Sequence, residues 1–212
     1  MSLYREERDL KESIEYSIRG FERIKKASIL MLVSFLAMGL VFSLIMYVRL
    51  SNVVVFLTYI VWMAIFMVSL FVYLAPGLDA VKEYNPYELR FPIIVMKAGL
   101  FPGIILAALA ISFNGLIVLI ASLLIVAGWI GLSITLFKLG SIFKIILFHI
   151  SGALALISTL LFIIPDIGFP LWIYINTLNW GIAIIAIKNA ITKLRDMLNE
   201  LKQSKNFYGY TI

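Results

Sequence analysis

The sequence predicts an all-α integral membrane protein of six transmembrane helices in three hairpins, with both termini in the cytoplasm. Its 212 residues are 62% hydrophobic and 14% charged, whereas soluble domains are near half apolar and a quarter charged. The apolar residues form uncharged runs long enough to cross a bilayer, and the basic residues gather beside the ends of those runs. These observations exclude an ordinary soluble domain.

Six apolar runs approach the roughly 20 residues that a helix needs to cross about 30 Å of hydrocarbon. The first two cover about 27–48 and 53–74. The segment between Lys97 and Lys138 holds no charge and is too long for one span. We expect it to turn at Phe113-Asn114-Gly115, because Asn and Gly tolerate a tight reversal. The remaining spans are then about 93–113, 116–137, 145–164 and 171–187.

The distribution of basic residues predicts the orientation. If the N-terminus is cytoplasmic, every Lys and Arg of the 18 except Arg49 falls on the cytoplasmic side, as the positive-inside rule requires. We therefore expect a multi-pass protein of the cell membrane. The outer connections, at 49–52, 114–115 and 165–170, are too short to form an extracellular domain. Tyr84, Tyr87 and Phe91 on the inner side, and Trp172 and Tyr174 on the outer side, suit interfacial belts.

Two cytoplasmic amphipathic helices are expected beside the 27–187 transmembrane domain, at 1–26 and 188–212. Each carries one apolar stripe at helical spacing. The stripes are Leu3, Leu10, Ile14, Phe21 and Ile24, and then Ile191, Leu194, Leu198 and Leu201. They either pack on each other, lie on the membrane surface, or pair with a helix of another copy or another protein. The first end holds seven basic and six acidic residues, and this near neutrality favours protein contact.

Ionisable residues inside a bilayer usually mark a functional site. The predicted spans contain no Asp or Glu, which weighs against a coupled pump. His149, the only histidine, lies near the inner boundary of the fifth span. The favoured interpretation is a neutral histidine bonded to a neighbouring helix. As a haem or metal ligand it lacks companions, and as a base beside Ser133 or Ser151 it implies a membrane hydrolase.

Asn176 and Asn179 lie three residues apart on the sixth span and therefore share a face. Ser158 and Thr159 lie at the same depth in the fifth span. Hydrogen bonds between the two pairs would fix these helices together. The alternative is that the amides line a polar pathway.

Gly99, Gly103 and Ala107 form a stripe of small residues on the third span. Small residues let helix backbones approach closely, which is how helices associate within lipid. The stripe serves either internal packing or oligomerisation, and Pro102 beside it introduces a kink.

The sequence lacks the residues that several kinds of chemistry require. Without cysteine there are no thiolate metal sites, disulfides or cysteine nucleophiles. No phosphate-binding glycine loop, paired carboxylates or dinucleotide fingerprint is present, so no cofactor is expected. The basic residues flank apolar runs instead of forming a basic domain, so we expect no nucleic-acid partner.

Two short segments carry a resemblance: Ser17-Ile-Arg-Gly-Phe-Glu-Arg-Ile-Lys-Lys-Ala-Ser28 before the first span, and Phe162-Ile-Ile-Pro-Asp-Ile-Gly168 late in the chain. They resemble uncharacterised multi-pass membrane proteins of thermophilic archaea, a resemblance that implies no activity. From the residues, we expect a non-catalytic accessory, scaffold or assembly subunit of a membrane complex or homo-oligomer. Its partners are membrane lipids and other membrane subunits or itself. The alternatives are a channel or transporter for a small or apolar solute, and then a membrane-embedded hydrolase using His149.

Overall fold

The computed structural model describes residues 2–48, 52–109, 115–162 and 168–208, and the side chains of 10–45, 54, 57–107, 115–161 and 171–203. Nearly all described residues are helical, so the predicted all-α class is confirmed. In chain order the elements are α1 (Ser2–Val48), α2 (Asn52–Val68), the π-helix η1 (Ser69–Leu74), α3 (Ala75–Lys82), α4 (Pro86–Leu109), α5 (Gly115–Phe143), α6 (Ile146–Phe162) and α7 (Gly168–Tyr208).

Five helical segments of the described chain are long and apolar enough to cross a membrane. They are α1, the continuous α2–η1–α3 segment, α4, α5 and α7, whereas α6 is apolar but only 17 residues long. Large apolar side chains also cover the outside of these helices. Leu40 is 67% exposed, Leu123 62% and Leu160 59%. Soluble monomers rarely expose extensive apolar patches, so this surface suits a protein embedded in lipid.

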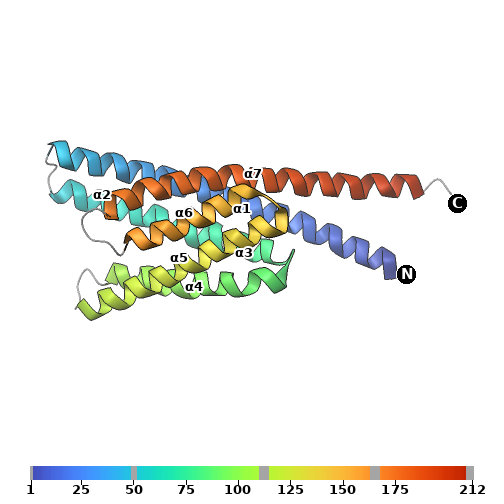
Figure 1. The fold of residues 1–212 in the computed structure, drawn as a ribbon, viewed down its shortest axis with the longest axis horizontal. Helices are drawn as coiled ribbons and strands as arrows, with labels where there is room; N and C mark the ends of the chain where they lie inside the picture. Colours follow the sequence, from blue (N-terminus) through green and yellow to red (C-terminus); the bar gives the residue numbers. More distant parts are fainter. Residues whose placement is uncertain (1, 49–51, 110–114, 163–167, 209–212) are drawn as a thin grey trace.

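The helices form one elongated bundle (Figure 1). The two longest, α1 and α7, pack along each other in opposite directions, and their free ends project beyond the other helices. The α4–α5 pair packs closely together, and α6 lies between α5 and α7. The α2–η1–α3 segment lies against α1, chiefly through η1 and α3. At 1.5 Å per residue, α1 is about 70 Å long, more than twice the hydrocarbon thickness.

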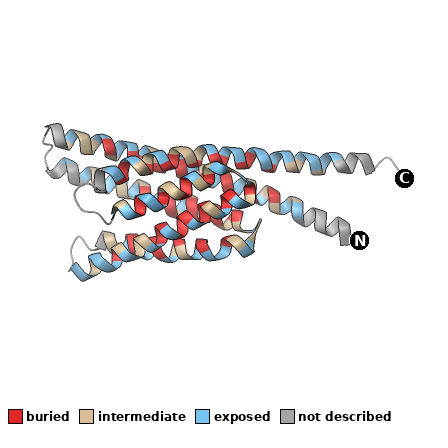
Figure 2. Cartoon of the chain, viewed as in Figure 1, coloured by how far each residue is buried: buried red, intermediate tan, exposed pale blue. Residues whose placement is uncertain are grey.

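Buried residues gather in the middle of the bundle, while the described residues of α7 beyond Leu194 are all intermediate or exposed (Figure 2). The fully buried Phe21 of α1 meets Phe143 of α5 edge-on at 5.2 Å between ring centroids and Phe148 of α6 at 6.2 Å. A second aromatic group centres on Phe35, whose ring lies 5.2 Å from that of Trp172 and 6.1 Å from that of Trp62. Aromatic contacts therefore join helices that are distant in sequence.

The sequence predicts that the second span ends at about residue 74, just before Pro76, but the helix does not end there. The chain stays helical to Lys82, through one stretch of π-helix. There the Ala75 N–H donates to the Leu70 carbonyl, five residues earlier. Proline lacks an N–H and clashes with the carbonyl four residues before it, and the wider π-turn accommodates Pro76 near the start of α3.

Each terminal amphipathic segment is continuous with its neighbouring span, in α1 and in α7. Two other helix boundaries differ from the predicted ones. The α4 helix starts at Pro86 instead of about 93, because proline suits a first helical turn. The α5 helix passes Lys138 and ends at Phe143. Lys144 then takes a positive φ of 51°, and the Ile145 N–H donates to the Gly140 carbonyl at 3.1 Å, a helix-ending motif. The turn predicted at 113–115 lies largely outside the described residues.

Candidate functional site

Asn176 and Asn179 are fully buried on the face of α7 that meets α6. The Asn176 side-chain amide donates to Ser158 Oγ at 2.6 Å and to the Trp172 carbonyl at 2.8 Å. The expected bond between Asn176 and Ser158 is therefore present. Asn179 instead accepts a hydrogen bond from Ser151. Thr159 does not take part, because its hydroxyl donates to the Ala155 carbonyl of its own helix.

The two serines that a hydrolase would use donate their hydroxyl protons to acceptors on neighbouring helices. The buried Ser133 hydroxyl of α5 donates to the Gly152 carbonyl of α6 at 2.6 Å, and the buried Ser151 hydroxyl donates to Asn179. A serine nucleophile needs its hydroxyl proton directed at a base. Here both protons point at other acceptors, so the two serines fasten α6 to its neighbours on either side.

The His149 side chain of α6 packs against α5 at Gly140, where the absence of a side chain leaves room for the imidazole ring. A Cβ atom added at Gly140 would lie 2.7 Å from both Cδ2 and Nε2 of the imidazole. The ring also lies beside Phe137, with 5.9 Å between centroids and 41° between planes. The structure therefore fits His149 as a packing residue, and among the described residues no side-chain hydrogen bond to it is present.

Gly99 and Gly103 pack inside the chain, where α4 meets α5. A Cβ at Gly99 would lie 2.3 Å from the Gly128 amide nitrogen, and one at Gly103 would lie 2.9 Å from that of Ile125. The reciprocal glycine of α5 is Gly128, which sequence reasoning did not single out. Its spacing of three residues from Gly131, which faces the backbone of Met96, was the available signal. Ala107, the third member of the stripe, lines a cavity.

The stripe on the N-terminal part of α1 packs within the chain. Ile14, Phe21 and Ile24 are buried. A Cβ atom added at Gly77 of α3 would lie 2.6 Å from the Ile24 side chain, so Ile24 packs directly on the α3 backbone. Leu10 is 44% exposed, and the side chain of Leu3 lies outside the described residues.

The stripe on α7 is likewise largely covered. Ile191 and Leu194 are buried, and Leu198 and Leu201 are partly buried against the core. Beside it the Arg195 guanidinium meets the Glu22 carboxylate of α1 at 3.0 Å. Of the alternatives for the two stripes, contact within the chain accounts for most of their residues.

Charged residues join the helices at the end where α3 meets α4. The Lys97 ammonium of α4 donates to the Asp79 carboxylate of α3. Lys138 of α5 pairs with Glu88 of α4 at 3.1 Å, and Lys193 of α7 donates to the Phe143 carbonyl at 3.0 Å. Each of these contacts links two helices.

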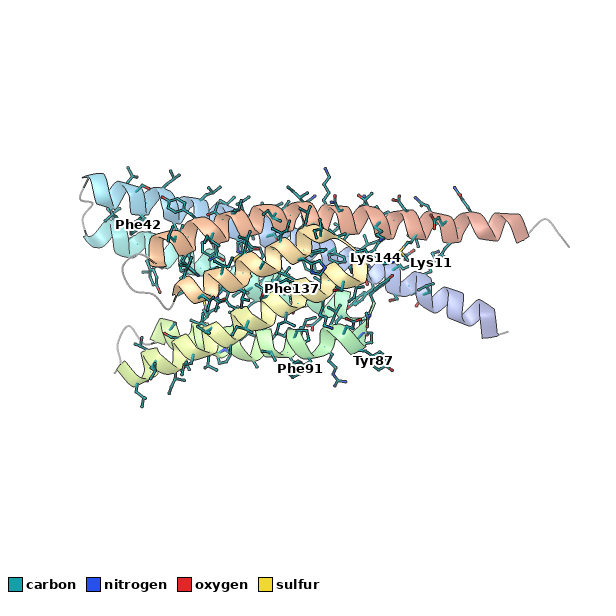
Figure 3. All side chains as sticks on the ribbon, in the orientation of Figure 1. Lys11, Phe42, Tyr87, Phe91, Phe137 and Lys144 are labelled. Atoms are coloured by element: carbon teal, nitrogen blue, oxygen red, sulfur yellow. The ribbon has the colours of Figure 1, made fainter. Side chains whose placement is uncertain are left out.

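Tyr87 and Phe91 point away from the bundle at the start of α4 (Figure 3), and are 97% and 71% exposed. Such rings suit a membrane interface. Tyr84 and Trp172, which the sequence also assigns to interfacial belts, pack inward instead. Tyr84 stacks on Phe143 at 5.2 Å, and Trp172 is only 5% exposed.

An apolar cavity of about 190 Å³ lies between α2 and the α4–α5 pair. The residues on the α1 and α2 side are Met38, Tyr59, Trp62, Met63 and Phe66. Those on the other side, from α4, α5 and α7, are Leu100, Ile104, Ala107, Ile125, Trp129 and Trp172. No charged residue lines the cavity, and neither His149 nor the two asparagines reach it.

The described residues contain no group of three or more His, Asp or Glu side chains placed to hold a metal ion. The chain matches no family model, no curated protein sequence and no solved structure. The resemblance to archaeal membrane proteins therefore stays a prediction.

Proposed function

We propose that this protein is a non-catalytic membrane subunit, which acts as an accessory, scaffold or assembly component of a larger membrane complex or a homo-oligomer. In this proposal it crosses the cell membrane six times, with α6 as the short span. Both termini are cytoplasmic, and its partners are membrane lipids together with other membrane subunits or further copies of itself.

One observation carries the proposal: the polar side chains with the best prospect of chemistry are used to hold helices together. Asn176 and Asn179 bond to serines of α6, and the Ser133 hydroxyl bonds to the α6 backbone. Hydrogen bonds of this kind between helices stabilise helix packing in lipid. Asn176 Oδ1 and Asn179 Nδ2 are buried without a hydrogen-bond partner among the described residues, but both amides are held in the contact between α6 and α7. The Ser133 and Ser151 hydroxyl protons are directed at these acceptors and not at a base.

The projecting parts of α1 and α7 supply the surface on which a partner would act. With α1 about 70 Å and α7 about 60 Å long, each extends well beyond about 30 Å of hydrocarbon. These segments carry most of the charged residues, and the basic bias of the chain favours the cytoplasm for them. The 44% exposed Leu10 is an apolar residue within this polar region.

The test is purification of the full chain from its native membranes in mild detergent, with the particle mass and its components measured. We expect the protein mass of the particle, without its bound detergent, to exceed that of one 24.0 kDa chain. Leu10→Glu should reduce recovery of the partner or second copy at least about fivefold, since interface residues that matter cost more than about 1 kcal/mol. Leu40→Ala, on an exposed apolar position within the span, is the control and should leave recovery unchanged. A monomer free of partners in every mild detergent would refute the proposal.

A channel or transporter for an apolar solute is the second candidate, and the observation that favours it is the aromatic cavity beside α2. Reconstituted protein that moves such a solute across vesicles would support it over the subunit proposal. His149, Asn176 and Asn179 give it no support, because they lie in helix contacts away from the cavity.

A further inference from the structure

We propose that the cavity between α2 and the α4–α5 pair binds a single hydrocarbon chain of a membrane lipid. This inference does not depend on the proposed function, because it concerns a face of the molecule that is distant from the projecting helix ends.

The chemistry of the walls selects hydrocarbon over water or ions. All eleven lining side chains are apolar or aromatic, and their only polar groups are the Tyr59 hydroxyl and the indole N–H groups of Trp62, Trp129 and Trp172. A buried water needs two to four polar partners, and apolar cavities stay dry. Aromatic and methionine side chains offer polarizable surfaces that adapt to a flexible chain.

The size of the cavity excludes a partner helix as its occupant. The volume is about 190 Å³. One turn of an α-helix, about 10 Å wide and 5.4 Å long, fills about 400 Å³. An apolar cavity of about 150 Å³ is already large enough to take up a small hydrocarbon such as benzene. A segment of one lipid chain therefore fits where a transmembrane helix does not.

The packing of the helices gives such a chain a way in from the bilayer. Within the described residues, α2 does not pack closely along either α4 or α5. Figure 1 shows the α4–α5 pair diverging from the other helices away from the projecting ends. Toward α3, the rings of Phe71 and Phe101 stack at 4.2 Å and join the two sides. The cavity is thus bounded toward α3, and lipid is the medium beside it.

The test uses intrinsic fluorescence, because three of the four tryptophans line the cavity. Full-length protein in detergent micelles is titrated with a phosphatidylcholine whose acyl chains carry bromine, which quenches tryptophan on contact. The unbrominated lipid serves as the blank. Native mass spectrometry of the same samples counts bound lipids and protein copies. Wild-type protein should show saturable quenching, with one lipid retained per chain.

Ala107→Phe places a ring in the cavity, and should weaken the saturable quenching at least tenfold and remove the retained lipid. Met63→Phe adds a ring from the opposite wall without adding a tryptophan, and should do the same. Ala98→Phe is the matched control, an exposed position on α4 outside the cavity, and should behave as wild type. Circular dichroism identifies the variants that keep the helical fold, and these are the ones compared.

Three results would overturn the proposal. The first is quenching of wild type that rises in proportion to bromolipid without saturation. The second is a folded Ala107→Phe or Met63→Phe protein that is quenched like wild type. The third is a wild-type dimer without bound lipid that becomes monomeric in the filled variants, since a second copy would then be the occupant.

Discussion

The two sides of this bundle are held together differently. On one side, α6 is fastened to α5 and α7 by hydrogen bonds from Ser133, Ser151 and Asn176, all between buried groups. On the other side, α2 faces the α4–α5 pair across an apolar cavity, with an aromatic stack and an ion pair near α3.

The difference illustrates what joins helices within lipid. Apolar side chains gain little by leaving hydrocarbon for a protein interior, so close backbone approach and hydrogen bonds must supply the attraction. The α4–α5 contact has glycines and the α6–α7 contact has polar pairs. The α2 helix offers neither toward α4 and α5, and there the helices stand apart.

The largest effect is expected where two backbones touch. Gly99→Ala brings a Cβ to 2.3 Å from the Gly128 nitrogen, which no rotamer change can relieve. We expect a loss of about 1–3 kcal/mol in unfolding free energy, measured by denaturant titration in micelles. Gly181→Ala is the control, because its Cβ would have no neighbour within 4 Å. It should be neutral or stabilising by up to about 1 kcal/mol. Equal effects of the two substitutions would contradict the close-contact account.

A smaller effect is expected where a glycine faces a movable side chain. Gly140→Ala crowds the His149 imidazole at 2.7 Å, and the ring can rotate away. The expected destabilisation is about 0.5–1.5 kcal/mol, the cost of an off-rotamer side chain. His149→Ala in the same chain should remove most of this penalty. Failure of the double variant to recover stability would show that the glycine serves another contact.

The polar pair on the other face of α6 should give a measurable coupling. A double-mutant cycle with Asn176→Ala and Ser158→Ala should yield about 0.6 kcal/mol, the average for hydrogen bonds between membrane helices. The matched cycle with Thr159→Ala should yield no coupling, because Thr159 bonds only within α6 among the contacts described. A larger coupling for Thr159 than for Ser158 would disprove this assignment.

The smallest effect is expected at the ion pair on the loosely packed side. The Lys97 and Asp79 side chains are 26% and 42% exposed, so solvent screens their attraction. Lys97→Met should lower the free energy of unfolding, measured by denaturant titration in micelles, by about 0.2–1 kcal/mol at low salt. The loss should be smaller at high salt. An effect that grows with salt would show that the pair does not act through charge.

The sequence predicts the all-α class because uncharged runs leave few alternatives. It also predicts the Asn176–Ser158 bond, since the depth of each residue follows from its position in a helix. It misses the bond of Asn179 to Ser151, because the rotation of α6 about its axis is set by tertiary packing. Pro76 is likewise misleading, because a π-turn keeps the helix continuous there. The cavity cannot be predicted, since its walls come from five helices whose relative placement is set by tertiary packing.

The most direct test of the account is labelling across the membrane, which the absence of cysteine makes simple. Gly115→Cys and Tyr87→Cys place single thiols at exposed positions near opposite ends of the α4–α5 pair. In intact cells, a membrane-impermeant maleimide should label the first variant and spare the second until the membrane is opened. Labelling of Tyr87→Cys alone would show that the protein has the opposite orientation in the membrane. Equal labelling of both in sealed cells would contradict a pair of helices that spans the bilayer.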